Sequence, residues 1–172
     1  MTTTTTESRS AEIRLTSTAF EHGARIPYVH SCEGDDVSPP LQWSGAPVST
    51  RSYALVCEDP DAPRGTYVHW VLFNIPGDAV ELARGVPTVP ELPSGARHGR
   101  NTAGDTAYAG PCPPPGNPHR YFFRLYALDI SLNLPAGTTK PELEKAMNQH
   151  IVAQGTLMGT YQRGETSGKR KA

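Results

Sequence analysis

The chain has 172 residues, enough for one domain with a substantial core, and its apolar fraction of 37% is typical of globular proteins. Its 16 Lys and Arg residues and 17 Asp and Glu residues give a net charge of -1. This near-balance argues against a chain whose overall field attracts nucleic acid or an anionic membrane. No apolar stretch approaches the ~20 residues of a membrane-spanning helix, and the polar N-terminus lacks the apolar segment of a secretory signal.

The predicted elements start after a polar, Thr-rich segment over residues 1–10, which we expect to be disordered. A short alternating strand is expected over 13–17. The continuous apolar run 53–57 predicts a strand buried on both faces. Aromatic and β-branched residues predict a further strand over 68–75. A strand over 121–128 would place on one face the alternate residues Tyr121, Phe123, Leu125 and Ala127.

One helix is predicted near the C-terminus. Thr139 followed by Glu142 forms a capping-box pattern, and Pro141 is tolerated in a first turn. We expect the helix to end at Gly155. Helical spacing places on one of its faces Leu143, Met147, His150 and Ile151. His150 on that face is interpreted as a packed histidine rather than a ligand.

A closing strand over 156–162 and a flexible basic tail over 164–172 complete the chain. Fourteen of the 17 prolines lie between Pro39 and Pro118. Because proline is excluded from helix interiors and central strands, this placement favours short strands joined by structured loops. We find no repeat and no linker, and we predict a single mainly β domain over 11–163 with C-terminal helical decoration.

The three cysteines are Cys32, Cys57 and Cys112. An odd number at wide spacing, with no signal peptide, does not indicate a disulfide framework, and no C-x-x-C pair indicates structural zinc. We therefore expect a reducing, cytoplasmic compartment and a small buried hydrophobic residue at Cys57. Cys112 lies among prolines, and a reactive thiol there is an alternative to a packed one.

Two segments are dense in residues suited to chemistry. The first runs over 58–63, with residues 67–70 shortly after it, and the second runs over 108–121. Asp59, two histidines (His69 and His119) and Tyr121 would meet if these strands are neighbours, with backbone N–H groups near Gly110 as further anion donors. A turn at 59–63 with loop-capping histidines is the structural alternative.

Several motifs in this chain resemble those of the phosphatidylethanolamine-binding protein family, most closely its bacterial Raf-kinase-inhibitor-like branch. The resemblance covers about residues 13–163. It is carried by S-P-P-L-Q-W (38–43), D-P-D-A-P (59–63), H-W (69–70), G-R-N (99–101), G-P-C-P-P (110–114), H-R-Y (119–121) and L-Y-A-L-D (125–129).

The resemblance implies an antiparallel β-sandwich of this family's type, with C-terminal helical elements and a small pocket for phosphate-type anions. It also implies a homodimer. The implied ligand-binding residues are Asp59, Asp61, His69, Gly110, Pro111, His119 and Tyr121. Ala109, where the family usually has glycine, and the unusual segment 102–107 border this pocket and bear on the identity of the ligand.

The leading hypothesis is a binding protein for a phosphate, a phospholipid headgroup or a carboxylate, with no cofactor and no bound metal. The alternative is a lyase, cyclase or dehydratase that transfers protons through His119, His69 and Asp59. A metal held by these two histidines and Asp59, and a protein-kinase regulator argued by analogy, are weaker hypotheses. We further expect Asp59 to hydrogen-bond His69 or His119, since a free carboxylate would repel an anion.

Overall fold

The computed structural model describes residues 11–164, so the Thr-rich start and all but the first residue of the basic tail lie outside the described residues. The elements in chain order are β1 (Ala11–Glu12), β2 (Arg14–Thr16), the 3-10 helix η1 (Tyr28–His30), β3 (Leu41–Ser44), β4 (Ser52–Asp59), β5 (Tyr67–Pro76), β6 (Glu81–Leu82), β7 (Arg97–His98), β8 (His119–Leu128), α2 (Lys140–Met147) and β9 (Ile151–Tyr161). The mainly β fold predicted from the sequence is confirmed.

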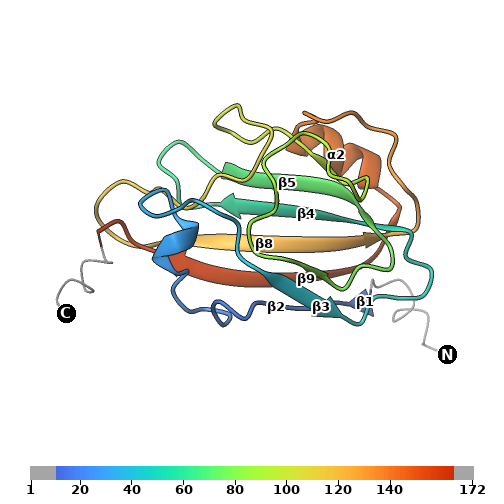
Figure 1. The fold of residues 1–172 in the computed structure, drawn as a ribbon, viewed down its shortest axis with the longest axis horizontal. Helices are drawn as coiled ribbons and strands as arrows, with labels where there is room; N and C mark the ends of the chain where they lie inside the picture. Colours follow the sequence, from blue (N-terminus) through green and yellow to red (C-terminus); the bar gives the residue numbers. More distant parts are fainter. Residues whose placement is uncertain (1–10, 165–172) are drawn as a thin grey trace.

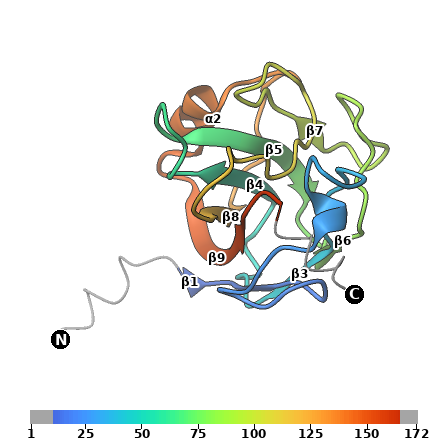
Figure 2. The same cartoon turned by 90° about the vertical axis from the view of Figure 1, so that its left-hand side faces the viewer.

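The strands form two sheets. The larger has the order β1-β9-β8-β4-β5-β7, and its long strands run side by side through the centre of the molecule (Figure 1). The smaller has the order β2-β3-β6 and lies below the larger one in Figure 2. The long strands pair antiparallel, whereas the short β1 pairs parallel with β9. The two sheets form a sandwich. In the larger sheet the central strand β4 pairs with β5 on one side and with β8, much later in the sequence, on the other.

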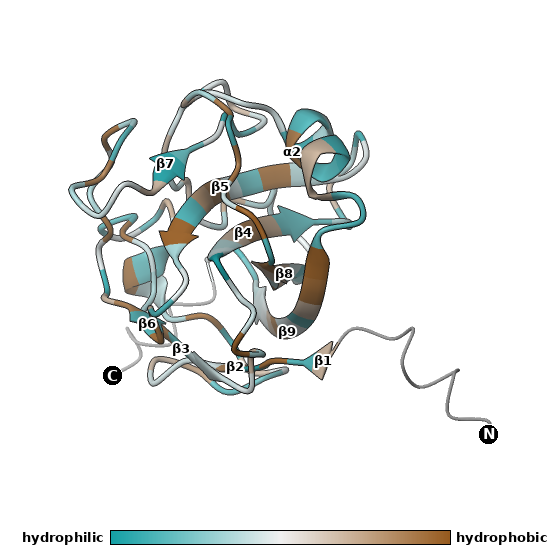
Figure 3. Ribbon diagram, turned by 90° about the vertical axis from the view of Figure 1, so that its right-hand side faces the viewer, coloured by the Kyte–Doolittle hydropathy of each residue, from teal (hydrophilic) through white to brown (hydrophobic). Residues whose placement is uncertain are grey.

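All of strand β4 is buried, and residues 53–57 within it are apolar because both of its faces are covered. Tyr53, Leu55 and Cys57 belong to the core between the two sheets. The alternate residues, Ala54 and Val56, belong to a second core on the opposite face. Figure 3 shows hydrophobic colours along parts of the central strands. The predicted face of β8 is also confirmed, because the four alternate residues of β8 from Tyr121 to Ala127 are buried between the sheets.

Helix α2 covers the second core with Leu143 and Met147. The predicted capping box at Thr139 is present, with Glu142 as its partner. The predicted helical extent was wrong, since α2 ends at Met147 and β9 begins at Ile151. Gln149 has a φ of 74°, which breaks the helix between them. The residues from Ile151 onward form a strand rather than a helix because β9 pairs with β8 along its length.

Candidate ligand-binding pocket

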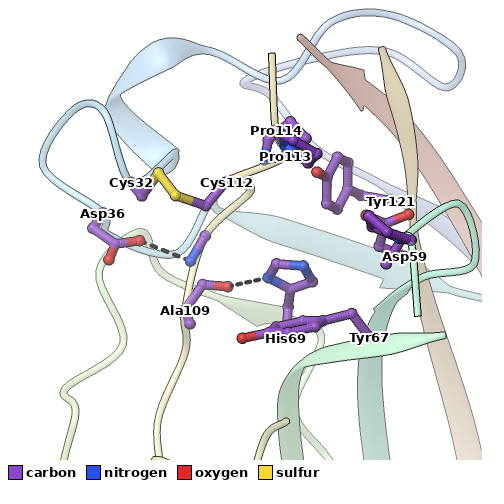
Figure 4. Close-up of a pocket in the computed structure, with 13 residues that line it drawn as sticks. Cys32, Asp36, Asp59, Tyr67, His69, Ala109, Cys112, Pro113, Pro114 and Tyr121 are labelled. Atoms are coloured by element: carbon purple, nitrogen blue, oxygen red, sulfur yellow. Dashed lines mark hydrogen bonds between the residues drawn. A yellow bond between two sulfur atoms is a disulfide. The ribbon is translucent and has the colours of Figure 1, made fainter. Parts of the chain in front are cut away.

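A cavity of about 410 Å³ opens where one end of β4, β5 and β8 meets two loops. Asp59 ends β4, His69 lies near the start of β5 and Tyr121 near the start of β8, and all three line the cavity (Figure 4). Cys32 and Asp36 line it from one loop, and the chain from Ala109 to Pro114 contributes the facing wall. The sequence-predicted neighbours Asp59, His69, Gly110 and Tyr121 therefore do come together.

A β-bulge turns the His69 side chain into this cavity. Cys57 pairs with Trp70 and Glu58 with Val68, so His69 is an extra residue in β5. Trp70 packs in the core between the sheets. A bulge bends its strand and re-aims a side chain, and here the His69 ring contacts the Tyr121 ring edge-on at 5.2 Å.

His69 is held as a neutral ring with a defined tautomer. Its Nδ1 lies 2.8 Å from the carbonyl oxygen of Ala109. Because a carbonyl only accepts, Nδ1 carries the proton and Nε2 keeps the lone pair in the neutral form. Burial lowers the pKa of His69, although the Ala109 carbonyl and the Asp59 charge act in the opposite direction.

Asp59 pairs with His119, one of the two partners expected from the sequence. The Nδ1 of His119 lies 2.7 Å from Asp59 Oδ2, and the backbone N–H of Asp61 donates to Oδ1 at 2.7 Å. Both oxygens of this buried carboxylate are therefore engaged. Asp59 can position the His119 ring, whereas direct contact with an anion would set two negative charges against each other.

Tyr121 contributes a buried hydroxyl whose hydrogen-bonding capacity is not satisfied within the fold. The hydroxyl makes no hydrogen bond of good geometry within residues 11–164, although the nearby Asp59 carboxylate interacts with it. Burial raises the pKa of Tyr121 far above its ordinary value, and the negative charge of Asp59 adds to this rise. The hydroxyl is thus protonated at any physiological pH and is available to donate.

Gly110 does not offer its backbone N–H to the cavity, contrary to the expectation of anion donors there. That N–H donates to Asp36 Oδ1 at 2.7 Å. A Cβ at position 110 would meet the carbonyl oxygen of His30 and would lie 2.7 Å from Asp36 Oδ1. Glycine is therefore required here by the close approach of two loops.

The other predicted residues lie outside the lining of the cavity. Asp61 accepts hydrogen bonds from the backbone N–H, Nε and Nη2 of Arg120 at 2.9, 3.0 and 2.9 Å. This pairing with Arg120 lowers the pKa of Asp61 to about 2. His119 pairs with Asp59, and the Pro111 carbonyl accepts from the backbone N–H of Cys32 at 3.0 Å. His119 and Pro111 therefore contact residues that line the cavity without lining it themselves.

The prediction of reduced, unpaired cysteines was wrong for two of the three. Cys32 and Cys112 form a disulfide that lines the cavity (Figure 4). Their separation of 80 residues in the chain hid the pairing, since sequence spacing does not report distance in a fold. Cys57 is buried in the core as expected, and burial raises the pKa of its thiol.

The two departures from the expected motifs have structural roles beside the pocket. Ala109 lines the cavity and supplies the carbonyl that orients His69. In the segment 102–107, Thr102 Oγ1 accepts from the backbone N–H of Val68, and the Ala107 carbonyl accepts from Asn101 Nδ2. The first bond fastens this segment to the part of β5 that carries His69, and the second holds the two ends of the segment together.

Sequence reasoning missed Asp36 and Tyr67 as lining residues. Tyr67 begins β5, and its ring lies 4.9 Å from that of His69. Asp36 has a φ of 59°, and it lies two residues before the S-P-P-L stretch that begins at Ser38. No pattern in the sequence indicates that Asp36 contacts Gly110, which lies 74 residues away in the chain. No cluster of three or more metal-ligating side chains occurs among residues 11–164, and none of their helices could span a membrane.

These observations define a β-sandwich with a small pocket at one end of its central strands, where a few polar groups lie among apolar walls. The sequence profile described as "Phosphatidylethanolamine-binding protein" matches residues 16–162, so the chain belongs to that family. A UPF0098 protein of Methanothermobacter thermautotrophicus is 47% identical over 152 residues, which cover 88% of this chain and 100% of that protein. Another UPF0098 protein, from Aquifex aeolicus, is 44% identical, with 89% and 90% covered.

Solved structures give the same result. The Chlamydia trachomatis protein CT736, described as a phosphatidylethanolamine-binding protein homologue, has a TM-score of 0.81 and 41% sequence identity. YbcL of Escherichia coli, described as a member of the mammalian family, has a TM-score of 0.81 and 32% identity. Each similarity covers 88% of this chain and 98% of the other chain. The chain is a ligand-binding protein of this family's type.

Proposed function

We propose that this chain binds small molecules that carry a phosphate or carboxylate group, and that this group sits beside Tyr121 and His69. The observation that carries the proposal is the buried Tyr121 hydroxyl, which makes no hydrogen bond of good geometry among residues 11–164. A buried polar group without a partner costs about 1–3 kcal/mol. An oxygen of an anionic ligand would accept this hydrogen bond and remove that cost.

The charges around the cavity specify how an anion is accepted. Among residues 11–164, no Lys or Arg lines the cavity, whereas Asp36 and Asp59 do. The neutral His69 ring presents a lone pair and not a proton. The anion therefore binds either with a proton of its own, as hydrogen phosphate does, or together with a proton taken up by His69. In the second case, binding is linked to proton uptake by the protein.

The size and walls of the cavity favour an organic ligand over a bare ion. Its volume of about 410 Å³ lies in the range of small-molecule sites. Pro113, Pro114 and Ala62 give it apolar walls. A phosphate monoester or a phospholipid headgroup would fill both the polar end and the space between these walls, and the name of the family is consistent with such a ligand.

Calorimetric titration with inorganic phosphate tests this proposal. Wild-type protein should bind phosphate, and Tyr121→Phe should weaken binding about 10- to 100-fold, because a hydrogen bond to a charged group contributes about 1.5–3 kcal/mol. Tyr126→Phe, five residues further along β8, is the matched control and should leave the affinity unchanged. Equal affinity in wild type and Tyr121→Phe would overturn the assignment.

A second candidate is an enzyme that transfers protons, and the paired rings favour it. A neutral imidazole with its lone pair on Nε2 lies 5.2 Å, ring to ring, from a protonated phenol. In such a lyase or cyclase, His69 is the base, and the Asp59–His119 pair supplies a second proton-transfer group. Incubation with phosphorylated and carboxylated metabolites should then show turnover that His69→Gln abolishes. Binding without turnover across such a panel would contradict the enzyme.

We keep the homodimer as a prediction. In the proline-rich middle of the chain, Val86 and Leu92 pack against the core of their own chain, and Val89 is exposed. Light scattering at micromolar concentration and above should give twice the chain mass. A strict monomer at these concentrations would overturn the prediction.

Kinase regulation and a cytoplasmic location also stay predictions. The disulfide bears on the second, because stable disulfides are typical of oxidising compartments. Cell fractionation, with thiol trapping at lysis, would locate the protein and report the state of Cys32 and Cys112 together. Recovery from an oxidising compartment would overturn the cytoplasmic prediction.

A further inference from the structure

Two loops form opposite walls of the cavity, and three links join them. Residues 31–37 and 110–118 contain no helix or strand. The disulfide joins Cys32 to Cys112, the backbone N–H of Cys32 donates to the Pro111 carbonyl at 3.0 Å, and that of Gly110 donates to Asp36 Oδ1 at 2.7 Å. The disulfide is the one covalent link, so it fixes the distance between the walls.

The surroundings of the disulfide favour its reaction with a thiol. Cys112 is exposed and Cys32 is partly exposed, so a thiol can reach the bond. Arg163 Nη2 lies 2.9 Å from Cys112 Sγ and 3.7 Å from Cys32 Sγ. A neighbouring guanidinium stabilises a thiolate. Arg163 is itself held in place, since its Nε donates to the Pro113 carbonyl at 2.8 Å.

We propose that the Cys32–Cys112 disulfide is a thiol-exchange site whose reduction by a dithiol loosens the two walls of the cavity. One thiolate of the dithiol attacks Cys32 Sγ, the S–S bond breaks, and its electron pair leaves on Cys112 as a thiolate facing Arg163. The second thiolate of the dithiol then attacks the dithiol sulfur that is bonded to Cys32. This step forms a disulfide within the dithiol and releases Cys32 as a thiolate. The dithiol is oxidised by two electrons, and the two cysteines are reduced and regain protons from solvent.

Reduction should make the two walls of the cavity more mobile. After reduction, two hydrogen bonds remain between loops that lack regular structure. Cys32, Asp36 and Cys112 all line the cavity, so its shape then fluctuates. Weaker binding of a ligand in the reduced state rests on the proposed function, whereas the loosening of the loops does not.

Hydrogen–deuterium exchange on oxidised and dithiol-reduced protein tests the loosening. The backbone amides of Cys32 and Gly110 should exchange at least about 10-fold faster after reduction, because these two amides donate across the gap and opening frees them. Amides of β8 should not change. The Cys32→Ser/Cys112→Ser double variant should exchange fast with or without dithiol. Equal exchange in both redox states of the wild type would overturn the proposal.

The role of Arg163 is tested by the rate of reduction. Arg163→Gln should slow the reaction with a dithiol on the order of 3- to 10-fold, because a less stabilised thiolate leaves more slowly. An unchanged rate would overturn the leaving-group assignment. Phosphate affinity measured on both redox states separates the two proposals. Faster exchange with no phosphate binding in either state would refute the proposed function and support the exchange site.

Discussion

Gly110→Ala should lower the free energy of unfolding by about 1–3 kcal/mol, the range for overpacking a well-filled site. The added Cβ would meet the His30 carbonyl oxygen and would lie 2.7 Å from Asp36 Oδ1. Neither neighbour can yield easily, since one is backbone and the other accepts the Gly110 N–H. The loops must separate to admit the methyl group, which also deforms the cavity and weakens phosphate binding.

Urea unfolding followed by tryptophan fluorescence measures this loss. Pro114→Ala is the matched control, because Pro114 lies in the same loop but is exposed, and it should change the unfolding free energy by less than about 0.5 kcal/mol. A Gly110→Ala variant as stable as the wild type would show that the loop contact is not tight. The explanation of the glycine in the G-P-C-P-P motif would then fail.

Anion affinity should rise as the pH falls through the histidine range, by about 10- to 100-fold between the two plateaus. Burial lowers the pKa of His69, so the ring is neutral in the free protein near neutral pH. A bound anion favours the imidazolium and raises that pKa. Affinity is therefore highest when both states are protonated and falls as the pH rises through the pKa of the bound state. Calorimetric titration with sulfate, whose charge is constant across mildly acidic to mildly alkaline pH, isolates the protein's contribution.

Two variants assign this pH dependence to one ring. His69→Gln should flatten it, because the glutamine amide cannot take up a proton in this pH range. His119→Gln removes the partner of Asp59 Oδ2 and should retain the pH dependence set by His69. A flat wild-type profile, or a pH dependence that survives His69→Gln, would contradict the role assigned to His69.

The long strands and the burial of β4 could be predicted from the sequence because residue type and period specify them locally. The residues of β4 alternate between two cores, and this explains why an unbroken apolar run was a correct signal for a strand. The C-terminal helix was predicted too long because His150 and Ile151 continue its apolar period. Pairing with β8 outweighed that local pattern from Ile151 onward.

The pocket was predictable where its residues end or begin strands. Asp59, His69 and Tyr121 are such residues, and neighbouring strands bring their ends together. Asp36 and the disulfide were not predictable, because their partners lie 74 and 80 residues away between two loops without regular structure. The use of the Gly110 N–H by Asp36 depends on the same long-range contact.

The central claim is that a phosphate-type group binds at Tyr121 and His69, and a crystal soaked in phosphate tests it most directly. The account predicts phosphate density within hydrogen-bonding distance of Tyr121 Oη and the His69 ring, and no such density in a Tyr121→Phe crystal soaked in the same way. An empty wild-type cavity at high phosphate concentration, or phosphate bound elsewhere on the chain with this cavity vacant, would contradict the claim.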